Sequence, residues 1–146
     1  MKVMIDTNVI MDVFCNRKGF VDDSLAVFKW CEVNELEGFL SALSVPNIIY
    51  IMRKDLNNEK IATMLASLSA IFKIVDLREA DLFRAIQLNF PDYEDAIQTV
   101  CAQRVKAKFI VTRDKKGFSS SPVPAVTPSE LLKCTGLGFL ESSQRL

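Results

Sequence analysis

The amino-acid sequence predicts an α/β protein with three layers, α/β/α, around a central parallel sheet of four to five short strands. Short apolar runs rich in branched side chains recur along the chain, as is typical of strands buried on both faces. Longer segments with apolar residues three and four positions apart separate these runs and indicate amphipathic helices. Because strands and helices alternate, the strands are expected to run parallel and the helices to cover both faces of the sheet.

The first predicted strand covers residues 3–5 and ends on a carboxylate, Asp6. Thr7 and Asn8 follow, and both residue types are favoured at helix N-caps, so a helix is expected in the apolar run after them. Asp6 therefore stands where a buried strand meets the start of a helix. In open α/β sheets, ligands bind at this edge, outside the carboxyl ends of the strands. The alternative is that Asp6 only caps the first helix.

Capping and helix-breaking residues predict where the later elements begin and end. Residues 22–24 and 57–59 are expected to cap helices at their N-termini, Gly38 is expected to end a helix, and Pro91 disfavours helix for the residue before it. Three apolar residues of the helix after the third strand are expected to face inward: Leu82, Phe83 and Ile86. The predicted order is a helix ending near 34, a strand at 39–43, helices at 44–54 and 58–71, a strand at 73–77, helices at 79–89 and 92–105, strands at 108–112 and 125–126, and a helix from 127.

The length of 146 residues predicts one domain, at 1–135, followed by a loose C-terminal tail at 136–146. Hydrophobic residues make up 49% of the chain and charged residues 25%, which is typical of a folded globular protein. Lys plus Arg and Asp plus Glu both number 18, and this zero net charge neither supports nor excludes binding to nucleic acid.

The sequence predicts a cytoplasmic protein that does not enter the membrane. The first residues lead straight into a strand, without the basic region and long apolar core of a signal peptide. No run of about 18 apolar residues is present. Four cysteines lie far apart without a CxxC pair and are expected to be buried, reduced thiols: Cys15, Cys31, Cys101 and Cys134.

The chain contains no histidine, and this narrows the chemistry that it can perform. It excludes Ser-His-Asp and Cys-His catalysis, imidazole zinc ligands and histidine general bases. Catalysis would have to depend on carboxylates, hydroxyls, lysines or a bound metal ion.

Three carboxylates are predicted at one edge of the sheet. Asp6 follows the first strand, Asp114 lies two residues past the fourth strand, and Asp95 lies in the first turn of the helix before it. Carboxylates that converge repel one another, so such a cluster is favoured only if a cation neutralises it. Oxygen ligands without cysteine or histidine select Mg²⁺ or Mn²⁺, and a metal ion with open coordination positions suits phosphodiester hydrolysis.

Each carboxylate also has a structural explanation. Asp95 and Asp92 could be helix-start charges that suit the helix dipole, and Asp114 could be an ordinary turn residue. The remaining acids near these segments are interpreted as capping or solvent-facing groups: Asp76, Asp81 and Glu94.

Four segments of the chain resemble PIN domains, and within them the small stand-alone bacterial members. They are residues 4–9, 43–50, 92–98 and 110–114, and the similarity runs from about residue 2 to 132. Each motif is short, but their order, spacing and placement on the predicted elements make the set fairly specific.

The resemblance implies a ribonuclease that depends on Mg²⁺ or Mn²⁺, often the toxin of a toxin–antitoxin pair. It implies that Asp6, Asp95 and Asp114 are the metal ligands and that Asn8 and Thr112 orient the site by hydrogen bonds. The sequence departs from the family near Asn47, where many members carry a glutamate. An amide can still coordinate an ion or position a water, so Asn47 is expected to support the site, but it lacks the charge, for which Asp92 or Glu94 could compensate. The alternative is a weakly active or inactive module that binds RNA or protein.

The resemblance also implies partners. Phosphate contacts to RNA are expected from basic residues, although each could also be an ordinary surface residue: Arg17, Lys18, Arg53, Lys54, Arg113, Lys115 and Lys116. Arg113, Lys115 and Lys116 are favoured because they flank Asp114. A cognate antitoxin and a homodimer are expected, with apolar residues of the third and fourth helices as the dimer interface: Ile48, Ile51, Met52, Met64 and Leu68. A third class, enzymes with an aspartyl-phosphate at Asp6, is disfavoured because Asn8 stands where a second acid is expected.

Overall fold

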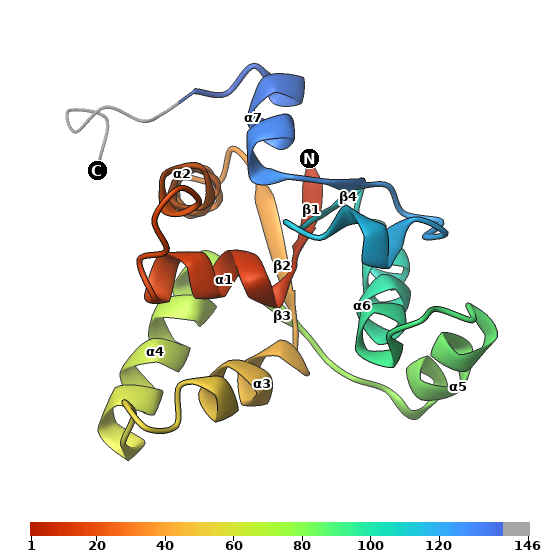
Figure 1. The fold of residues 1–146 in the computed structure, drawn as a ribbon, viewed down its shortest axis with the longest axis horizontal. Helices are drawn as coiled ribbons and strands as arrows, with labels where there is room; N and C mark the ends of the chain where they lie inside the picture. The colour runs from red at the N-terminus through yellow and green to blue at the C-terminus, as the bar shows by residue number, and fades with distance from the viewer. Residues whose placement is uncertain (139–146) are drawn as a thin grey trace.

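A computed structural model describes residues 1–138 and confirms the predicted three-layer architecture around a parallel sheet (Figure 1). Its five strands lie in the order β3-β2-β1-β4-β5, and every neighbouring pair is parallel. In the centre, Val3 lies between Gly38 of β2 and Phe109 of β4. The strands are β1 (Lys2–Ile5), β2 (Glu37–Ser41), β3 (Lys73–Val75), β4 (Phe109–Val111) and β5 (Ala125–Val126).

Helices cover both faces of this sheet, with α5 and α6 on one side and the other α-helices on the opposite side (Figure 1). The helices are α1 (Thr7–Phe14), α2 (Val21–Glu32), α3 (Ser44–Ile51), α4 (Asn58–Ile71), α5 (Glu79–Gln87), α6 (Tyr93–Arg104) and α7 (Pro128–Thr135), with a 3₁₀ turn, η1 (Lys115–Phe118). Among the described residues, none of the helices has the length and apolar character needed to span a bilayer.

Alternating residues of the central strand enter two separate cores. Val3 and Ile5 pack with α1, α2, α4 and α7 on one face, whereas Met4 packs with α6 on the other. All three side chains are fully buried. Burial of each such side chain stabilises the fold by roughly 1.5–3 kcal/mol. A strand buried on both faces explains the continuous apolar run in the sequence.

The chain changes direction across the sheet between β1 and β4. From β1 it proceeds outward through β2 to β3, then returns to place β4 on the other side of β1. The carboxyl ends of these two strands therefore border the crevice where ligands bind in such sheets. The Asp6 N–H donates to the Val111 carbonyl at 2.9 Å and holds the two strand ends together.

The roles predicted for residues 22–24 and for Gly38 were wrong. Helix α2 begins at Val21 with Phe20 as its N-cap, so Asp22 and Asp23 lie in its first turn instead of capping it. Gly38 does not end a helix but lies inside β2. A Cβ atom at Gly38 would lie 2.7 Å from both Cys31 Sγ and Phe72 Cδ1, so this strand position accepts only glycine without rearrangement of its neighbours.

The predicted inward face of α5 was also wrong. Phe83 and Ile86 are 63% and 64% exposed, and Leu82 is also exposed, at 37%. The buried face of α5 instead carries Asp81, whose carboxylate lies 2.8 Å from the Arg104 guanidinium of α6. Because this cation lies at the helix contact, a carboxylate occupies the inward face in place of an apolar side chain.

Asp81 thus has a larger role than the predicted cap. Its Oδ2 accepts from the Arg78 backbone N–H at 2.9 Å, as a cap does, but its side chain is buried. Asp76 lies on the surface as predicted and pairs with Arg78 and Arg104.

Three of the five residues predicted for a dimer interface lie in the core. Ile48, Met64 and Leu68 are buried in the same core as Val3 and Ile5, so they are not available to a partner. Ile51 is exposed, whereas Met52 is partly buried. Of the predicted interface residues, Ile51 is therefore the one that the structure leaves exposed.

The predicted burial of the cysteines was right for two of the four. Cys31 and Cys101 are buried free thiols, but Cys15 and Cys134 are exposed. Of the predicted tail at 136–146, residues 139–146 lie outside the described part of the chain. Within the described part, Leu137 packs against the core and Trp30 Nε1 donates to the Gly138 carbonyl at 2.6 Å.

Candidate active site

Asp6 is both the N-cap of α1 and a buried carboxylate at the sheet edge. Its Oδ1 accepts from the Thr7 N–H at 2.8 Å, which makes Asp6, and not the predicted Thr7 or Asn8, the capping residue. Its Oδ2 accepts from Thr112 Oγ1 at 2.7 Å. Burial raises the pKa of Asp6 above its ordinary value, although the hydrogen bonds from Thr112 and Thr7 oppose this effect. The capping role and a site role are therefore compatible.

The Thr112 hydroxyl connects the ends of β1 and β4. It donates to Asp6 and accepts from Asn8 Nδ2 at 3.3 Å and from the Asp114 N–H at 3.0 Å. Asn8 Oδ1 in turn accepts from the Arg113 N–H at 3.3 Å. Thr112 is fully buried, so these bonds hold the Asp6 carboxylate in one orientation. The orienting roles of Asn8 and Thr112 at a metal site stay a prediction.

Asp95 lies in the first turn of α6, where its N–H donates to Asp92 Oδ1 at 3.1 Å. Burial, followed by the negative charges of Asp6, Asp92, Asp114 and Glu94, raises the pKa of Asp95 to about 7. The structure thus brings the predicted acids of three separate segments close enough to disfavour one another's ionisation.

Gly117 leaves room for two of these carboxylates, and sequence analysis did not identify it. A Cβ atom at this position would lie 2.7 Å from Asp95 Oδ2 and 3.5 Å from Asp114 Oδ2. Both carboxylates therefore border the same small volume beside η1. In the sequence, Gly117 is only a glycine three residues after Asp114. Its closeness to Asp95 cannot be predicted until the position of α6 is known.

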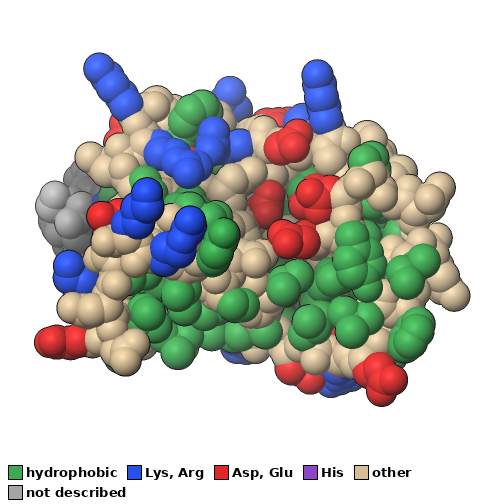
Figure 2. Space-filling view, turned by 60° about the horizontal axis from the view of Figure 1, so that its bottom comes forward, with side chains coloured by type: hydrophobic (Ala, Val, Ile, Leu, Met, Phe, Trp, Pro, Cys, Tyr) green, Lys and Arg blue, Asp and Glu red, His purple; other side chains and the backbone are tan. Residues whose placement is uncertain are grey.

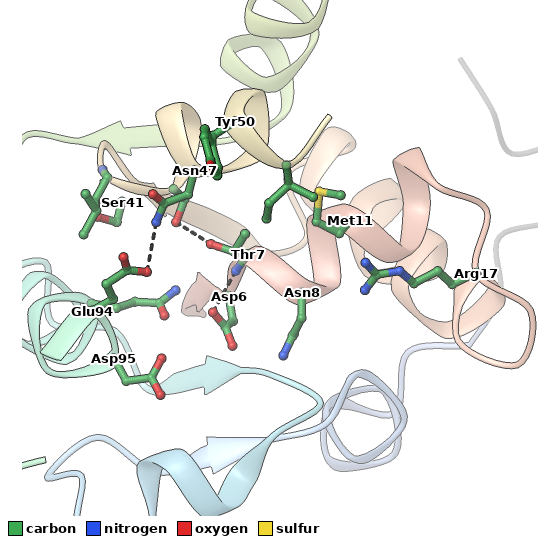
Figure 3. A pocket seen from close by; sticks show the side chains of 14 residues that line it. Asp6, Thr7, Asn8, Met11, Arg17, Ser41, Asn47, Tyr50, Glu94 and Asp95 are labelled. Carbon is green, nitrogen blue, oxygen red and sulfur yellow. Dashed lines mark hydrogen bonds between the residues drawn. The ribbon is translucent and has the colours of Figure 1, made fainter. Parts of the chain in front are cut away.

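A cavity of about 430 Å³ opens at this edge of the sheet. Figure 3 shows Asp6 and Asp95 pointing into the same space from β1 and α6. Further side chains that border the cavity include Thr7 and Asn8 of α1, Asn47 and Tyr50 of α3, Glu94 of α6, and Arg17 of the loop after α1. Asp114, which is exposed, lies outside this lining set.

The donor set fits a hard divalent cation. Its ligand atoms are carboxylate and amide oxygens, and a cation would remove the repulsion that raises the Asp95 pKa. In residues 1–138, however, no three acidic, cysteine or histidine side chains are arranged closely enough to hold a metal ion. The carboxylates would therefore have to move inward to coordinate one ion.

Comparison with known proteins identifies the family. A sequence model of the PIN domain matches residues 2–116, most of the chain. The chain belongs to the PIN domain family. Ribonuclease VapC1 of Aquifex aeolicus is 28% identical to this PIN domain over 134 residues, covering 88% of this chain and 92% of that protein.

Solved structures with the same fold include FitAcB from Neisseria gonorrhoeae and a toxin–antitoxin complex from Klebsiella pneumoniae. The first has a TM-score of 0.65 at 20% identity and covers 87% of this chain and 98% of its own. The second has a TM-score of 0.66 at 21% identity, with coverages of 86% and 97%. At these identities, the likeness to the PIN domain described here is one of fold.

The basic residues predicted to bind RNA divide into two groups in this PIN domain. Arg113 turns inward: its Nε lies 2.9 Å from buried Asp12, and its guanidinium lies 4.2 Å from the centre of the Phe20 ring. Arg17 borders the cavity and lies 3.6 Å from the same Asp12.

The lysines lie on the surface. Lys115 pairs with Glu130 at 3.0 Å, whereas Lys18 and Lys116 are exposed and form no ion pair with residues 1–138. In Figure 2, Lys and Arg side chains gather on one side of a group of acidic side chains, and hydrophobic side chains lie below it. Positive charge therefore lies beside a group of acidic side chains on this face of the molecule.

Asn47 faces Glu94 across the cavity. Asn47 Nδ2 donates to Glu94 Oε2 at 3.1 Å, so this bond joins α3 to α6 (Figure 3). Glu94 was interpreted from sequence as a solvent-facing group, and it is exposed, but its carboxylate borders the cavity.

Proposed function

We propose that this PIN domain is a ribonuclease that hydrolyses RNA phosphodiester bonds with the help of a bound Mg²⁺ or Mn²⁺ ion. The observation that carries the proposal is the convergence of Asp6, Asp95 and Asp114 from three segments on one edge of the sheet, with an Asp95 pKa of about 7. The relative that is 28% identical carries the name ribonuclease, which supports the same activity.

In this proposal, Asp6, Asp95 and Asp114 hold the ion. When bound, a divalent cation supplies charge neutralisation and polarises the phosphate and an attacking water. Thr112 and the Thr7 N–H each engage one oxygen of Asp6 and leave its remaining lone pairs for the ligand. Because the pKa of Asp95 is raised to about 7, part of the free protein carries a proton on this carboxylate at neutral pH, and binding of the ion would be favoured by higher pH.

The RNA backbone would lie along the cavity beside the lysines. Lys116 and Lys18 are the exposed cations best placed to contact phosphates, and Lys115 and Arg17 would join them by exchanging their carboxylate partners for phosphate. Contacts of this kind give affinity without reading sequence.

The direct test is cleavage of a labelled single-stranded RNA with Mn²⁺ or with EDTA. The wild-type chain is expected to cleave only with metal, and Asp6→Asn is expected to lose at least about 100-fold in rate. Asp55→Asn, at an exposed surface acid outside the cavity, is the matched control and is expected to cleave normally. Equal cleavage by Asp6→Asn and wild type would refute the proposal.

A second candidate function is a PIN-fold module that binds RNA or protein without cleaving RNA. The neutral amide of Asn47 at the cavity is the observation that favours it. Calorimetry separates the two functions: retained RNA binding without Mn²⁺ binding at millimolar concentration would favour the module.

The biological setting that we propose is a toxin–antitoxin pair, with the antitoxin and a second copy of the chain as partners. Structures of the same fold are described as a toxin–antitoxin complex from Klebsiella pneumoniae and as VapBC2 from Rickettsia felis bound to a promoter DNA fragment, the latter with a TM-score of 0.66. Co-purification with the product of the neighbouring gene tests the antitoxin, and light scattering tests the dimer.

A further inference from the structure

The bond between Asn47 and Glu94 is a direct link between the two helical layers at the cavity. Asn47 comes from α3 on one side of the sheet, and Glu94 comes from the first turn of α6 on the other. The bond uses Glu94 Oε2, and no hydrogen bond within residues 1–138 uses Oε1. One carboxylate oxygen is therefore held in place, and the other is left for a ligand.

Glu94 shares its cavity with two of the acids that the proposed function uses. Glu94, Asp6 and Asp95 border the same cavity, and Figure 3 shows Glu94 beside the space into which the two aspartates point. An exposed glutamate would ordinarily rotate away from like charges into solvent, because surface side chains gain little from one fixed geometry. The Asn47 amide opposes that rotation, since an amide N–H donates to a carboxylate without adding charge.

We propose that Glu94 is a fourth carboxylate of the metal site and that Asn47 is the positioning residue that holds it there. The inference deepens the proposed function and depends on it. It gives the neutral residue at position 47 a role: an acid there would lie about 3 Å from Glu94 and repel it, whereas the amide fixes it.

The test measures Mn²⁺ binding to the full chain by calorimetry, without RNA, so that the result does not depend on catalysis. Glu94→Gln is expected to weaken Mn²⁺ binding by at least about tenfold, the smallest loss typical of substitutions beside a metal site. Asn47→Ala is expected to weaken Mn²⁺ binding too, but by a smaller factor than Glu94→Gln does. The double variant is expected to match Glu94→Gln alone, because Asn47 acts only through Glu94.

Glu79→Gln is the matched control, since Glu79 is an exposed glutamate in the first turn of another helix, α5. It is expected to bind Mn²⁺ like wild type. Melting temperatures in EDTA are expected to be unchanged for all four variants, which separates a loss of metal binding from a loss of fold.

The outcomes distinguish this inference from the proposed function. If Asp6→Asn abolishes Mn²⁺ binding and Glu94→Gln keeps the wild-type affinity within twofold, only the role of Glu94 is overturned. Additive losses in the double variant would overturn the positioning role of Asn47. Absence of Mn²⁺ binding by wild type would overturn the proposed metal dependence, and the inference with it.

Discussion

At the scale of single residues, the Thr112 hydroxyl has the most connections at the site. It donates to Asp6 and receives the Asn8 amide and the Asp114 N–H. A buried hydroxyl with one donor and two acceptor positions in use has no spare capacity. It is therefore the group through which the ends of β1 and β4 are kept in register at the acids.

Thr112→Val keeps the shape of this side chain and removes its hydroxyl. We expect a loss of about 1–3 kcal/mol in the free energy of unfolding, because the Asp6 and Asn8 groups lose a partner. We expect about a 10–100-fold weaker Mn²⁺ affinity, measured by calorimetry.

Thr99→Val is the control, since Thr99 is also buried but its hydroxyl bonds only to the Asp95 carbonyl of its own helix, at 2.9 Å. Equal effects of the two substitutions on Mn²⁺ affinity would show that Thr112 has no special role at the metal site.

At the scale of elements, the turn η1 and helix α6 meet at Gly117. Gly117→Ala places a methyl group 2.7 Å from Asp95 Oδ2, in the position where this carboxylate now lies. We expect a folded protein, because the neighbour that must move is the end of a side chain. Mn²⁺ affinity should fall about tenfold as the Asp95 carboxylate is displaced from Asp114.

Gly138→Ala is the matched change, since a Cβ atom there meets nothing within 4 Å. The prediction for Gly117 fails if calorimetry gives both alanine variants the same Mn²⁺ affinity as wild type.

The loop after β4 is tied to α1 and α2 by a buried ion pair. Asp12 is fully buried, Arg113 Nε lies 2.9 Å from its Oδ2, and Ser24 Oγ donates to the same oxygen at 3.2 Å. Arg113 was predicted as an RNA contact, and that role stays a prediction. Its geometry assigns it a structural role that can be measured without RNA.

Arg113→Ala should lower the free energy of unfolding by about 3 kcal/mol, because it leaves the Asp12 charge buried, with only Arg17 nearby. Lys115→Ala removes an exposed pair with Glu130 and should cost less than about 1 kcal/mol. Urea titrations of both variants check this contrast, and similar losses would argue against a structural role for Arg113.

At the scale of the whole molecule, the acidic edge reduces the stability of the metal-free protein. The pKa of Asp95 is raised from 3.8 to about 7, so the folded chain retains a proton that the unfolded chain releases. The resulting stability is fully present below the unfolded pKa and is lost as the pH rises through about 7. Metal-free protein should therefore become less stable between pH 5 and pH 8.

Asp95→Asn should remove much of this pH dependence in EDTA. At pH 8 it should be more stable than wild type by about 1–2 kcal/mol, a small difference because Asp95 is only half-buried and solvent screens its charge. Mn²⁺ should stabilise wild type more at pH 8 than at pH 5 and should leave Asp95→Asn nearly unchanged. Urea unfolding with and without Mn²⁺ measures both effects. Parallel pH profiles for the two proteins would contradict the assignment.

The elements that the sequence predicted correctly are those whose signals are local. Helix α4 begins after Asn57, whose side chain accepts from the Lys60 N–H, and α7 begins after Thr127 with a capping box to Glu130. The buried strands were predicted from apolar runs, and alternation of strands and helices predicted the parallel sheet. Such patterns depend on neighbours along the chain, which the sequence contains.

The errors arose where a distant segment decides what a residue contacts. Gly38 was assigned to a helix end because the approach of Phe72 to β2 leaves no trace near position 38. Phe83 and Ile86 face outward because Asp81 occupies the contact between α5 and α6, where it pairs with Arg104 of α6.

By itself, the sequence determined that this protein is a parallel α/β domain with acids at its strand ends, since strand polarity alone brings Asp6 and the loop after β4 to one edge. Only the tertiary structure decided which side chains complete that edge. Gly117 makes room for two carboxylates, Arg113 turns away to Asp12, and Asn47 holds Glu94 at the cavity. The reason is physical: each of these contacts joins segments whose separation in space is set by packing of the two cores, and no local pattern encodes it.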